Sequence, residues 1–448
     1  MTPARRGLTI GLVLTITLVA FEALAVITIL PAIKDALQGI SLYGWVTSAF
    51  QLGLLVGIVV AGGQADRRGP GPPFVAGVRV FMAGLTIGGL APSMLVLVLA
   101  RGLQGLGAGA IPAVAYAAIG RTYPEALRPR VFAVLSTAWV VPGLIGPAVS
   151  ALVAARLGWR WVVLGLLPLV IASGTLAWPS LRRLGPPAEP LVQRGRLPRA
   201  VGVAAGAGLV LAGLTSRSLV AGALLVAAGL AVGVVPLRRL LPPGTLTARP
   251  GLPVTVLSRG LLTFAFFGAD TYVPLALTSV RGQSTAVASL AVTAATLAWT
   301  AGSWVQERQA AAWPGRRLTR VGLLIVAAGI ACEAAALHPA VPRAVAVAGW
   351  AVGGLGIGLA YSPISLIVLG EAPSGQEGVA SASLQLAENL GVALGAGLGG
   401  VLVAAGAVAG RASAGIGGAF AMTAGVALLA AMLARRVPRR TIPAPDPP

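Results

Sequence analysis

Three charged residues stand inside long apolar stretches of this chain, where a charge in hydrocarbon is costly. Glu22 and Asp270 carry carboxylates, Arg101 carries a guanidinium, and each lies well inside its apolar run. Such groups face a protein interior or a watery cavity and have a partner there. Because a carboxyl group in that setting can take up and release a proton, Glu22, Arg101 and Asp270 are the candidates for proton coupling.

Glu22 and Arg101 are expected at similar depth, each about eight residues, or roughly 12 Å, from the outer end of its span. Equal depth permits an ion pair, so Glu22 is either a coupling carboxylate or part of a structural ion pair. Asp270 also has two interpretations, since the following 271–274 segment (Thr-Tyr-Val-Pro) could unwind the helix and leave the acid as a local cap. Low dielectric disfavours an ionised carboxyl and a nearby cation favours it. A cationic substrate would therefore compete with a proton for the carboxylate, which is the basis of proton/substrate exchange.

Further polar and aromatic residues fall in the same apolar stretches. Gln385 and Glu388 are three residues apart and share a helix face, where substrate contact and inter-helix hydrogen bonding are both open. Glu333 is expected to be an interfacial acid, and Arg259, near an inner end, to extend its guanidinium to the surface. Aromatic side chains could line a cavity for amphiphilic or cationic substrates, or could pack in the core or against lipid. The candidate cavity residues are Gln104, Trp139, Tyr272, Trp299, Gln385 and Glu388.

The composition predicts the elements that position these residues. Of 448 residues, 56% are hydrophobic and 10% are charged, whereas a soluble protein carries about 25% charge, and mean hydropathy is +0.88. Recurring apolar runs of spanning length predict an all-α polytopic membrane protein. A hairpin that does not fully cross is an alternative for the short pair within 200–237. We expect about fourteen spans, at 8–30, 43–63, 74–92, 94–119, 131–155, 159–179, 200–216, 219–237, 253–277, 284–305, 320–337, 343–369, 378–405 and 415–434.

The distribution of positive charge predicts the orientation. With the N-terminus inside, 23 of the 33 Lys and Arg residues fall in inner segments and 7 in outer ones. This bias follows the positive-inside rule and predicts cytoplasmic termini. It also explains the net charge of +21 without a nucleic-acid partner. The near-exclusive use of arginine is typical of a GC-rich bacterium, so we expect a bacterial inner membrane protein.

Cysteine and histidine usage excludes several kinds of site. The chain has one cysteine, Cys332, and one histidine, His338. A single cysteine rules out an internal disulfide and a cysteine-cluster metal site, and a lone histidine makes histidine-based catalysis unfavourable. We therefore expect no metal site and no cofactor.

The sequence also repeats itself at an offset near 249. The glycine-rich stretch 105–109 matches 354–358. Arg67 and Arg68 match Arg316 and Arg317, and the position of Glu22 shifted by this offset falls within one residue of Asp270. Two similarly oriented six-helix halves would place a substrate site near the midplane. The expected organisation is a bundle at 1–180, a linker at 181–199, two extra spans or a hairpin at 200–240, a linker at 241–252, a bundle at 253–437 and a disordered tail at 438–448.

Several motifs resemble those of the major facilitator superfamily. The loop at 62–71 reads Gly-Gly-Gln-Ala-Asp-Arg-Arg-Gly-Pro-Gly and is similar to the family's Gly-x-Leu-Ala-Asp-Arg-x-Gly-Arg-Arg/Lys signature. The stretch 101–109 resembles Arg-x-x-Gln-Gly-x-Gly-x-Gly, and 142–151 resembles the antiporter motif Gly-x-x-x-Gly-Pro-x-x-Gly-Gly. The first-span acid followed by 28–31 (Thr-Ile-Leu-Pro) is similar to the fourteen-spanner drug:proton antiporters of EmrB/QacA type.

The resemblance implies a major facilitator fold of two six-helix bundles with two extra spans between them. Asp66 would cap and charge-pair at a cytoplasmic gate, and Arg101 would belong to the proton-coupling network. The antiporter motif residues Gly143, Gly146 and Pro147 would make the fifth span pliant. The full gate motif comprises Gly62, Asp66, Arg67, Arg68, Gly69, Arg316 and Arg317.

The resulting functional hypothesis is a secondary transporter that exports small amphiphilic compounds in exchange for protons. It would work as a monomer, driven by the proton gradient. A symporter or facilitator of the same fold that moves a metabolite or nutrient is the first alternative. A membrane-embedded lipid-modifying enzyme is a third, disfavoured because the sequence shows no paired loop acids and no phosphate-cradling loop. No nucleotide-binding motif supports ATP-driven pumping.

Overall fold

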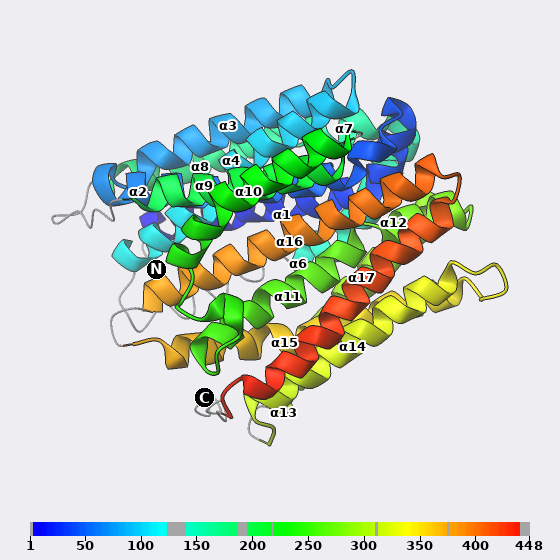
Figure 1. The fold of residues 1–448 in the computed structure, drawn as a ribbon. Coiled ribbons are helices and arrows are strands. Elements are labelled where there is room, and N and C mark those ends of the chain that lie inside the picture. Colours follow the sequence, from blue (N-terminus) through cyan, green and yellow to red (C-terminus); the bar gives the residue numbers. More distant parts are fainter. Residues whose placement is uncertain are drawn as a thin grey trace. The chain divides into compact units, whose positions relative to one another are not determined.

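A computed structural model describes residues 3–122, 140–185, 195–216, 218–309, 312–373 and 377–439 (Figure 1). Helices make up the described part of the chain, which contains no strand. The all-α fold class is therefore confirmed. Two compact units divide the chain: the first comprises 1–42 and 49–204, and the second comprises 43–48 and 205–448.

The first unit is built from long helices around an apolar core. A central cluster of aromatic and aliphatic side chains, including Phe74, Phe81 and Leu85, is almost completely buried. Helix α3 packs extensively on α4, and α1 packs on both α6 and α8. The helices are α1 (Pro3–Leu37), α2 (Tyr43–Arg68, from residue 49), α3 (Gly71–Gly89), α4 (Met94–Thr122), α6 (Val140–Leu157), α7 (Trp159–Leu164), α8 (Leu167–Arg182) and the start of α9 (Arg196–Leu214).

The second unit contains the rest of α9 and the remaining helices. Its best-packed helix pairs are α14 with α15, α13 with α15, and α11 with α16. The elements are α10 (Leu219–Leu240), η3 (Thr245–Thr247), α11 (Leu252–Asp270), α12 (Val273–Leu275), η4 (Ala276–Val280), α13 (Thr285–Gln309), α14 (Gly315–Ala336), α15 (Ala344–Glu371), α16 (Glu377–Val408), α17 (Ala412–Leu433) and η5 (Ala434–Arg436).

The number of spans agrees with the sequence. In the described residues, 13 helices are long and apolar enough to cross a membrane, and a shorter apolar helix covers Val141–Leu157. That shorter helix belongs to the span predicted at 131–155, whose first part lies outside the described residues. The predicted sixth span is broken into α7 and α8. The division between the units falls at 204/205, within α9, and the predicted domain boundaries remain predictions.

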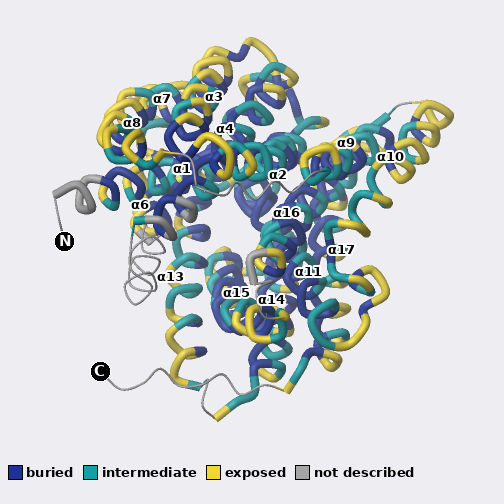
Figure 2. Tube along the Cα trace, turned by 90° about the vertical axis from the view of Figure 1, so that its left-hand side faces the viewer, coloured by how far each residue is buried: buried dark blue, intermediate teal, exposed yellow. Residues whose placement is uncertain are grey.

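Helix α10 has the least buried surface of the spanning helices. Only 17% of its apolar window is buried, and in Figure 2 it is mostly yellow and teal. Its contacts with α9 run through glycines, because a Cβ on Gly206 would lie 2.7 Å from the carbonyl oxygen of Gly229. An apolar helix with so much exposed surface is suited to contact with lipid.

The predicted linker at 241–252 is a folded connection. It contains the 3₁₀ helix η3, and Thr245 within it is 2% exposed. The main-chain amide of Gly251 donates to the carbonyl of Arg436 at 3.4 Å, and Arg436 Nη1 donates to the carbonyl of Ala248 at 3.2 Å. These hydrogen bonds tie the start of α11 to the end of the last helix.

Glycine contacts reveal the repeat in three dimensions. Gly77 and Gly107 face each other between α3 and α4, just as Gly322 and Gly356 do between α14 and α15. Close backbone approach of this kind is the usual role of small residues between membrane helices. The repeat is thus a repeat of helix packing.

One sequence match of the repeat is wrong. Arg67 and Arg68 occupy the last turn of α2, whereas Arg316 and Arg317 occupy the first turn of α14. The basic pairs therefore belong to different helices of their units. They matched at one offset because both flank short connections that follow an apolar helix.

Candidate functional site

The first unit contains a buried charge cluster formed by Glu22, Arg101 and Gln104. Arg101 Nη1 donates to Glu22 Oε1 and, at 2.6 Å, to Gln104 Oε1. The Glu22 and Arg101 side chains are 1% and 4% exposed, so a close ion pair lies inside the unit. The ion pair between Glu22 and Arg101, which their similar expected depth permitted, is present.

Small residues and one aromatic ring shape this cluster. Gln104 Nε2 donates to the carbonyl of Gly84 at 3.0 Å, and a Cβ on Gly84 would come within 2.6 Å of the Gln104 side chain. The Arg101 guanidinium lies over the Phe50 ring, 4.2 Å from its centroid. This cation–π contact compensates part of the desolvation of the guanidinium.

The cluster leaves one oxygen available for chemistry. Glu22 Oε2 is buried and has no hydrogen-bond partner among the described residues. Arg101 pairs with the carboxylate through Oε1 only. Separating Arg101 from Glu22 would leave a buried charge without its counter-charge.

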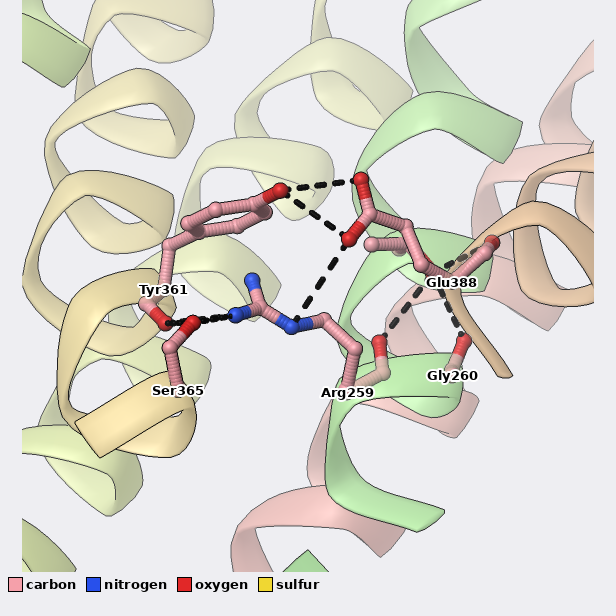
Figure 3. A network of polar contacts seen from close by, with 6 residues as sticks. Arg259, Gly260, Tyr361, Ser365 and Glu388 are labelled. Carbon is pink, nitrogen blue, oxygen red and sulfur yellow. Dashed lines mark hydrogen bonds and ion pairs between the residues drawn. The ribbon is translucent and has the colours of Figure 1, made fainter. Parts of the chain in front are cut away.

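The second unit has its own arginine–glutamate pair, which Figure 3 shows at close range. Arg259 Nε lies 3.9 Å from Glu388 Oε2, and Arg259 Nη2 donates to the Tyr361 carbonyl at 2.9 Å and to Ser365 Oγ. The Tyr361 hydroxyl bonds both Glu388 oxygens, at 2.9 and 3.0 Å. Helices α11, α15 and α16 contribute these side chains.

The expectation that Arg259 extends to the surface is wrong. Its side chain is 1% exposed, and its guanidinium carbon lies 3.4 Å from the centroid of the Tyr361 ring. Its partners inside the unit are Glu388, 18% exposed, and the Tyr361 carbonyl and Ser365 hydroxyl of α15. Distance to a helix end did not reveal those partners, because they come from other helices.

A third cluster surrounds Asp270 at the end of α11. The indole of Trp350 donates Nε1–H to Asp270 Oδ1 at 2.8 Å. Helix α11 ends at Asp270, and the chain resumes as α12 at Val273 and then as the π-helical η4. The interruption that the 271–274 segment left open is present, and the side-chain partner of Asp270 is a tryptophan on α15.

Glu333 is not an interfacial acid. It is 1% exposed in the last turn of α14, and the charge of Asp270 acts on it. Its Oε1 atom is buried without a hydrogen-bond partner among the described residues. The expectation failed because neighbouring helices cover the end of α14.

The remaining cavity candidates occupy different environments. Trp299 is partly buried and contacts the rings of Phe266 and Tyr361, with centroids 5.8 and 5.5 Å apart. Tyr272 is fully buried and donates its hydroxyl to the carbonyl of Ala396, as a packing residue does. Gln385 is partly buried on α16. Trp139 lies outside the described residues.

Comparison with known proteins decides the family. A model of the Major Facilitator Superfamily matches residues 12–396. This chain belongs to that superfamily. The facilitator fold also appears in the partially occluded, inward-open xylose transporter XylE from E. coli, with a TM-score of 0.67 at 15% identity over 96% of this chain and 97% of that one.

Two relatives align with nearly the whole of this chain. A probable multidrug-efflux transporter of Mycobacterium tuberculosis is 28% identical over 89% of this chain and 87% of its own length. The uncharacterised transporter YebQ of Escherichia coli is 28% identical over 88% of each chain. The protein is thus a multi-pass membrane transporter and not an enzyme.

The loop signature at 62–71 begins in the last turns of α2. Asp66 is exposed in the last turn of α2 and interacts electrostatically with Arg196 of α9. The expected helix-capping role of Asp66 is wrong, because α3 begins after Pro70 with no side-chain cap. Gly69 has a φ of +81° and ends α2, a conformation that favours glycine.

The other motif residues are placed as follows. Gly62 has open space around it, and Arg67 and Arg68 are exposed. Arg316 Nη1 donates to the carbonyl of Arg435 at 3.1 Å, and the Arg317 guanidinium lies 4.0 Å from the centroid of the Trp313 ring. The antiporter motif residues Gly143, Gly146 and Pro147 all lie within α6.

The sequence interpretation missed Tyr361 and underrated Arg259 and Glu333. Tyr361 stands eleven residues after Trp350 in the same glycine-rich span, so no charge marked it. A signal for Arg259 and Glu333 did exist, since both interrupt apolar stretches. The rule that an ionisable residue in the membrane has a partner applies to them as it does to Glu22.

Proposed function

We propose that this protein is a drug:proton antiporter of the fourteen-helix type, which exports small amphiphilic or drug-like compounds by alternating access. The observation that carries the proposal is the Glu22–Arg101–Gln104 cluster, a titratable carboxylate buried with its counter-charge inside a transporter of apolar helices. The similarity to a probable multidrug-efflux transporter supports the export of drug-like compounds.

The cluster supports a mechanism in which proton and substrate exclude each other. Arg101 compensates the charge of Glu22 while the ion pair is closed. A rearrangement that opens the pair leaves a buried carboxylate without compensation, which takes up a proton. A cationic substrate near the carboxylate opposes that proton, so the entry of one expels the other.

The second unit supplies groups suited to substrate contact. Glu388 retains 18% exposure beside Arg259, and Trp299 and Tyr361 add partly buried aromatic surface. An acid with aromatic neighbours is the chemistry that recognises amphiphilic cations. We further propose a bacterial cell membrane location with cytoplasmic termini, and a functional monomer.

The test uses purified protein in liposomes with an imposed pH gradient. A panel of lipophilic cations and neutral amphiphiles is added while a lumenal dye reports pH. The wild type is compared with Glu22→Gln and with Glu307→Gln, which neutralises an exposed acid on α13. Export by exchange predicts compound-driven proton movement in the wild type and in Glu307→Gln, and its loss in Glu22→Gln.

The other results assign the function differently. Proton movement that survives in Glu22→Gln would move coupling to Asp270 or Glu388. If protons move in the same direction as the compound, the protein is a symporter. If no compound on the panel moves protons, a narrow metabolite carrier or facilitator replaces the multidrug interpretation.

A further inference from the structure

The two units can be compared position by position through their glycine contacts. Arg101 precedes Gly107 by six residues on α4, and Trp350 precedes Gly356 by six residues on α15. Because Gly107 and Gly356 make equivalent contacts, Trp350 occupies the position of Arg101. Each donates to an acid on another helix of its own unit, Arg101 to Glu22 on α1 and Trp350 to Asp270 on α11.

The same register identifies the counterpart of Glu333. Gly88 follows Gly77 by eleven residues on α3, and Glu333 follows Gly322 by eleven on α14. A Cβ on Gly88 would lie 3.0 Å from Gln104 Nε2, so the first unit fills this space with an amide. Gly353 stands at the position of Gln104 in the second unit, and the side chain on the facing helix is the carboxylate of Glu333.

These replacements change the balance of charge. The Glu22–Arg101–Gln104 cluster of the first unit combines one acid with one guanidinium, so the cluster has no net charge. The second unit combines two acids with a neutral indole. Asp270 is 3% exposed and Glu333 is 1% exposed, and Asp270 acts electrostatically on Glu333. Two ionised carboxyls that interact electrostatically while both are almost fully buried, with no cation paired to either among the described residues, would carry an uncompensated desolvation cost.

Among the described residues of the surrounding elements, no other charge offsets the two acids. Arg259 is eleven residues before Asp270, about 16 Å along the helix, and is paired with Glu388. The arginines of α14 lie at its opposite end, Arg343 is exposed, and Arg281 donates to loop carbonyls. The charged and titratable residues of the elements packed around the pair are Arg259, Tyr272, Glu307, Arg308, Arg316, Arg317, Arg320, Cys332, Tyr361, Glu371, Glu377, Glu388, Arg435 and Arg436.

We propose that Asp270 and Glu333 form a shared-proton carboxyl pair, which holds one proton at neutral pH. Trp350 holds Asp270 Oδ1 in place by a hydrogen bond. Glu333 Oε1 is buried and has no hydrogen-bond partner among the described residues, so this oxygen is where the shared proton would bind or be accepted. The pair is a proton-binding site in the second unit, separate from the Glu22–Arg101 ion pair. It rests on burial and charge and does not depend on which compound is exported.

Infrared spectroscopy of the purified full-length protein tests this site without any substrate. A protonated carboxyl has a C=O stretch that shifts in D₂O, and the wild type should show it at neutral pH. The Asp270→Asn/Glu333→Gln double variant should lack that band, and Glu307→Gln should keep it. Each single variant loses the like-charged neighbour, so its remaining band should disappear at a pH lower by about one unit or more.

Several results would overturn the proposal. A wild type without the band at neutral pH, a double variant that retains it, or a single variant that titrates as the wild type would each do so. A band abolished by added sodium would assign the site to a metal cation. Asp270→Asn retains an oxygen that can accept from Trp350. If these variants do not fold, Asp- and Glu-specific isotope labelling of the wild type must shift the band.

Because no substrate is present, failure of the export assay leaves this result intact. Conversely, successful export with no neutral-pH band would disprove the shared proton while the antiport function stood. The two proposals therefore fail separately.

Discussion

Neutralising Glu22 alone should destabilise the protein more than neutralising Glu22 and Arg101 together. In Glu22→Gln the guanidinium of Arg101, 4% exposed, stays charged because arginine is not deprotonated in proteins. It keeps Gln104 and the Phe50 ring as neighbours but loses its counter-charge. Breaking a buried pair by removing one partner costs about 3–5 kcal/mol.

The converse variant should be milder. In Arg101→Gln, Glu22 is left without its cation, but a carboxyl can escape the cost of a buried charge by taking up a proton. In the double variant Glu22→Gln/Arg101→Gln two amides replace two charges, so no charge remains buried. The expected order of stability is wild type and double variant first, then Arg101→Gln, then Glu22→Gln.

Thermal and chemical unfolding in detergent micelles measures this cycle, with Glu307→Gln as the control for loss of an exposed acid. A double variant no more stable than Glu22→Gln would refute the reasoning, because the penalty would then come from lost packing. A Glu22→Gln protein as stable as the wild type would show that the pair is hydrated. The cycle also protects the transport test, since it separates loss of coupling from loss of fold.

Three further substitutions test the packing and the second unit. Gly105→Ala drives a Cβ into a main-chain carbonyl of α2 and should cost about 1–3 kcal/mol, whereas Gly62→Ala, in open space, should cost far less; equal melting temperatures would contradict the glycine contact. Glu388→Gln removes the counter-charge of Arg259 and should cost about 1–3 kcal/mol in unfolding experiments. Tyr361→Phe keeps the ring over the guanidinium but loses the hydroxyl, so a loss of about 1 kcal/mol is expected.

The sequence predicted the features that depend on short stretches of neighbouring residues. Hydropathy and length gave the helical class and nearly every span, and charge interrupting those spans identified Glu22, Arg101 and Asp270. The proline-containing segment after Asp270 indicated where the helix could end, and α11 does end at Asp270. These features are local, since apolar runs and helix breakers act within a few turns.

What the sequence did not predict depends on which helices meet. Arg259 and Glu333 looked peripheral when measured from their helix ends, yet both side chains are buried. Tyr361 carries no charge and became part of the site only through its contacts with Glu388 and Arg259. The basic pair Arg316 and Arg317 matched in sequence but not in position.

The repeat shows how one scaffold can support two kinds of chemistry. The glycine contacts between α3 and α4 recur between α14 and α15, because backbone approach tolerates no side chain there. The polar positions are free of that constraint, and they differ: arginine becomes tryptophan, and glycine becomes glutamate. Equivalent positions in the two units therefore carry different charge: an acid paired with a guanidinium in the first unit, and two acids beside an indole in the second.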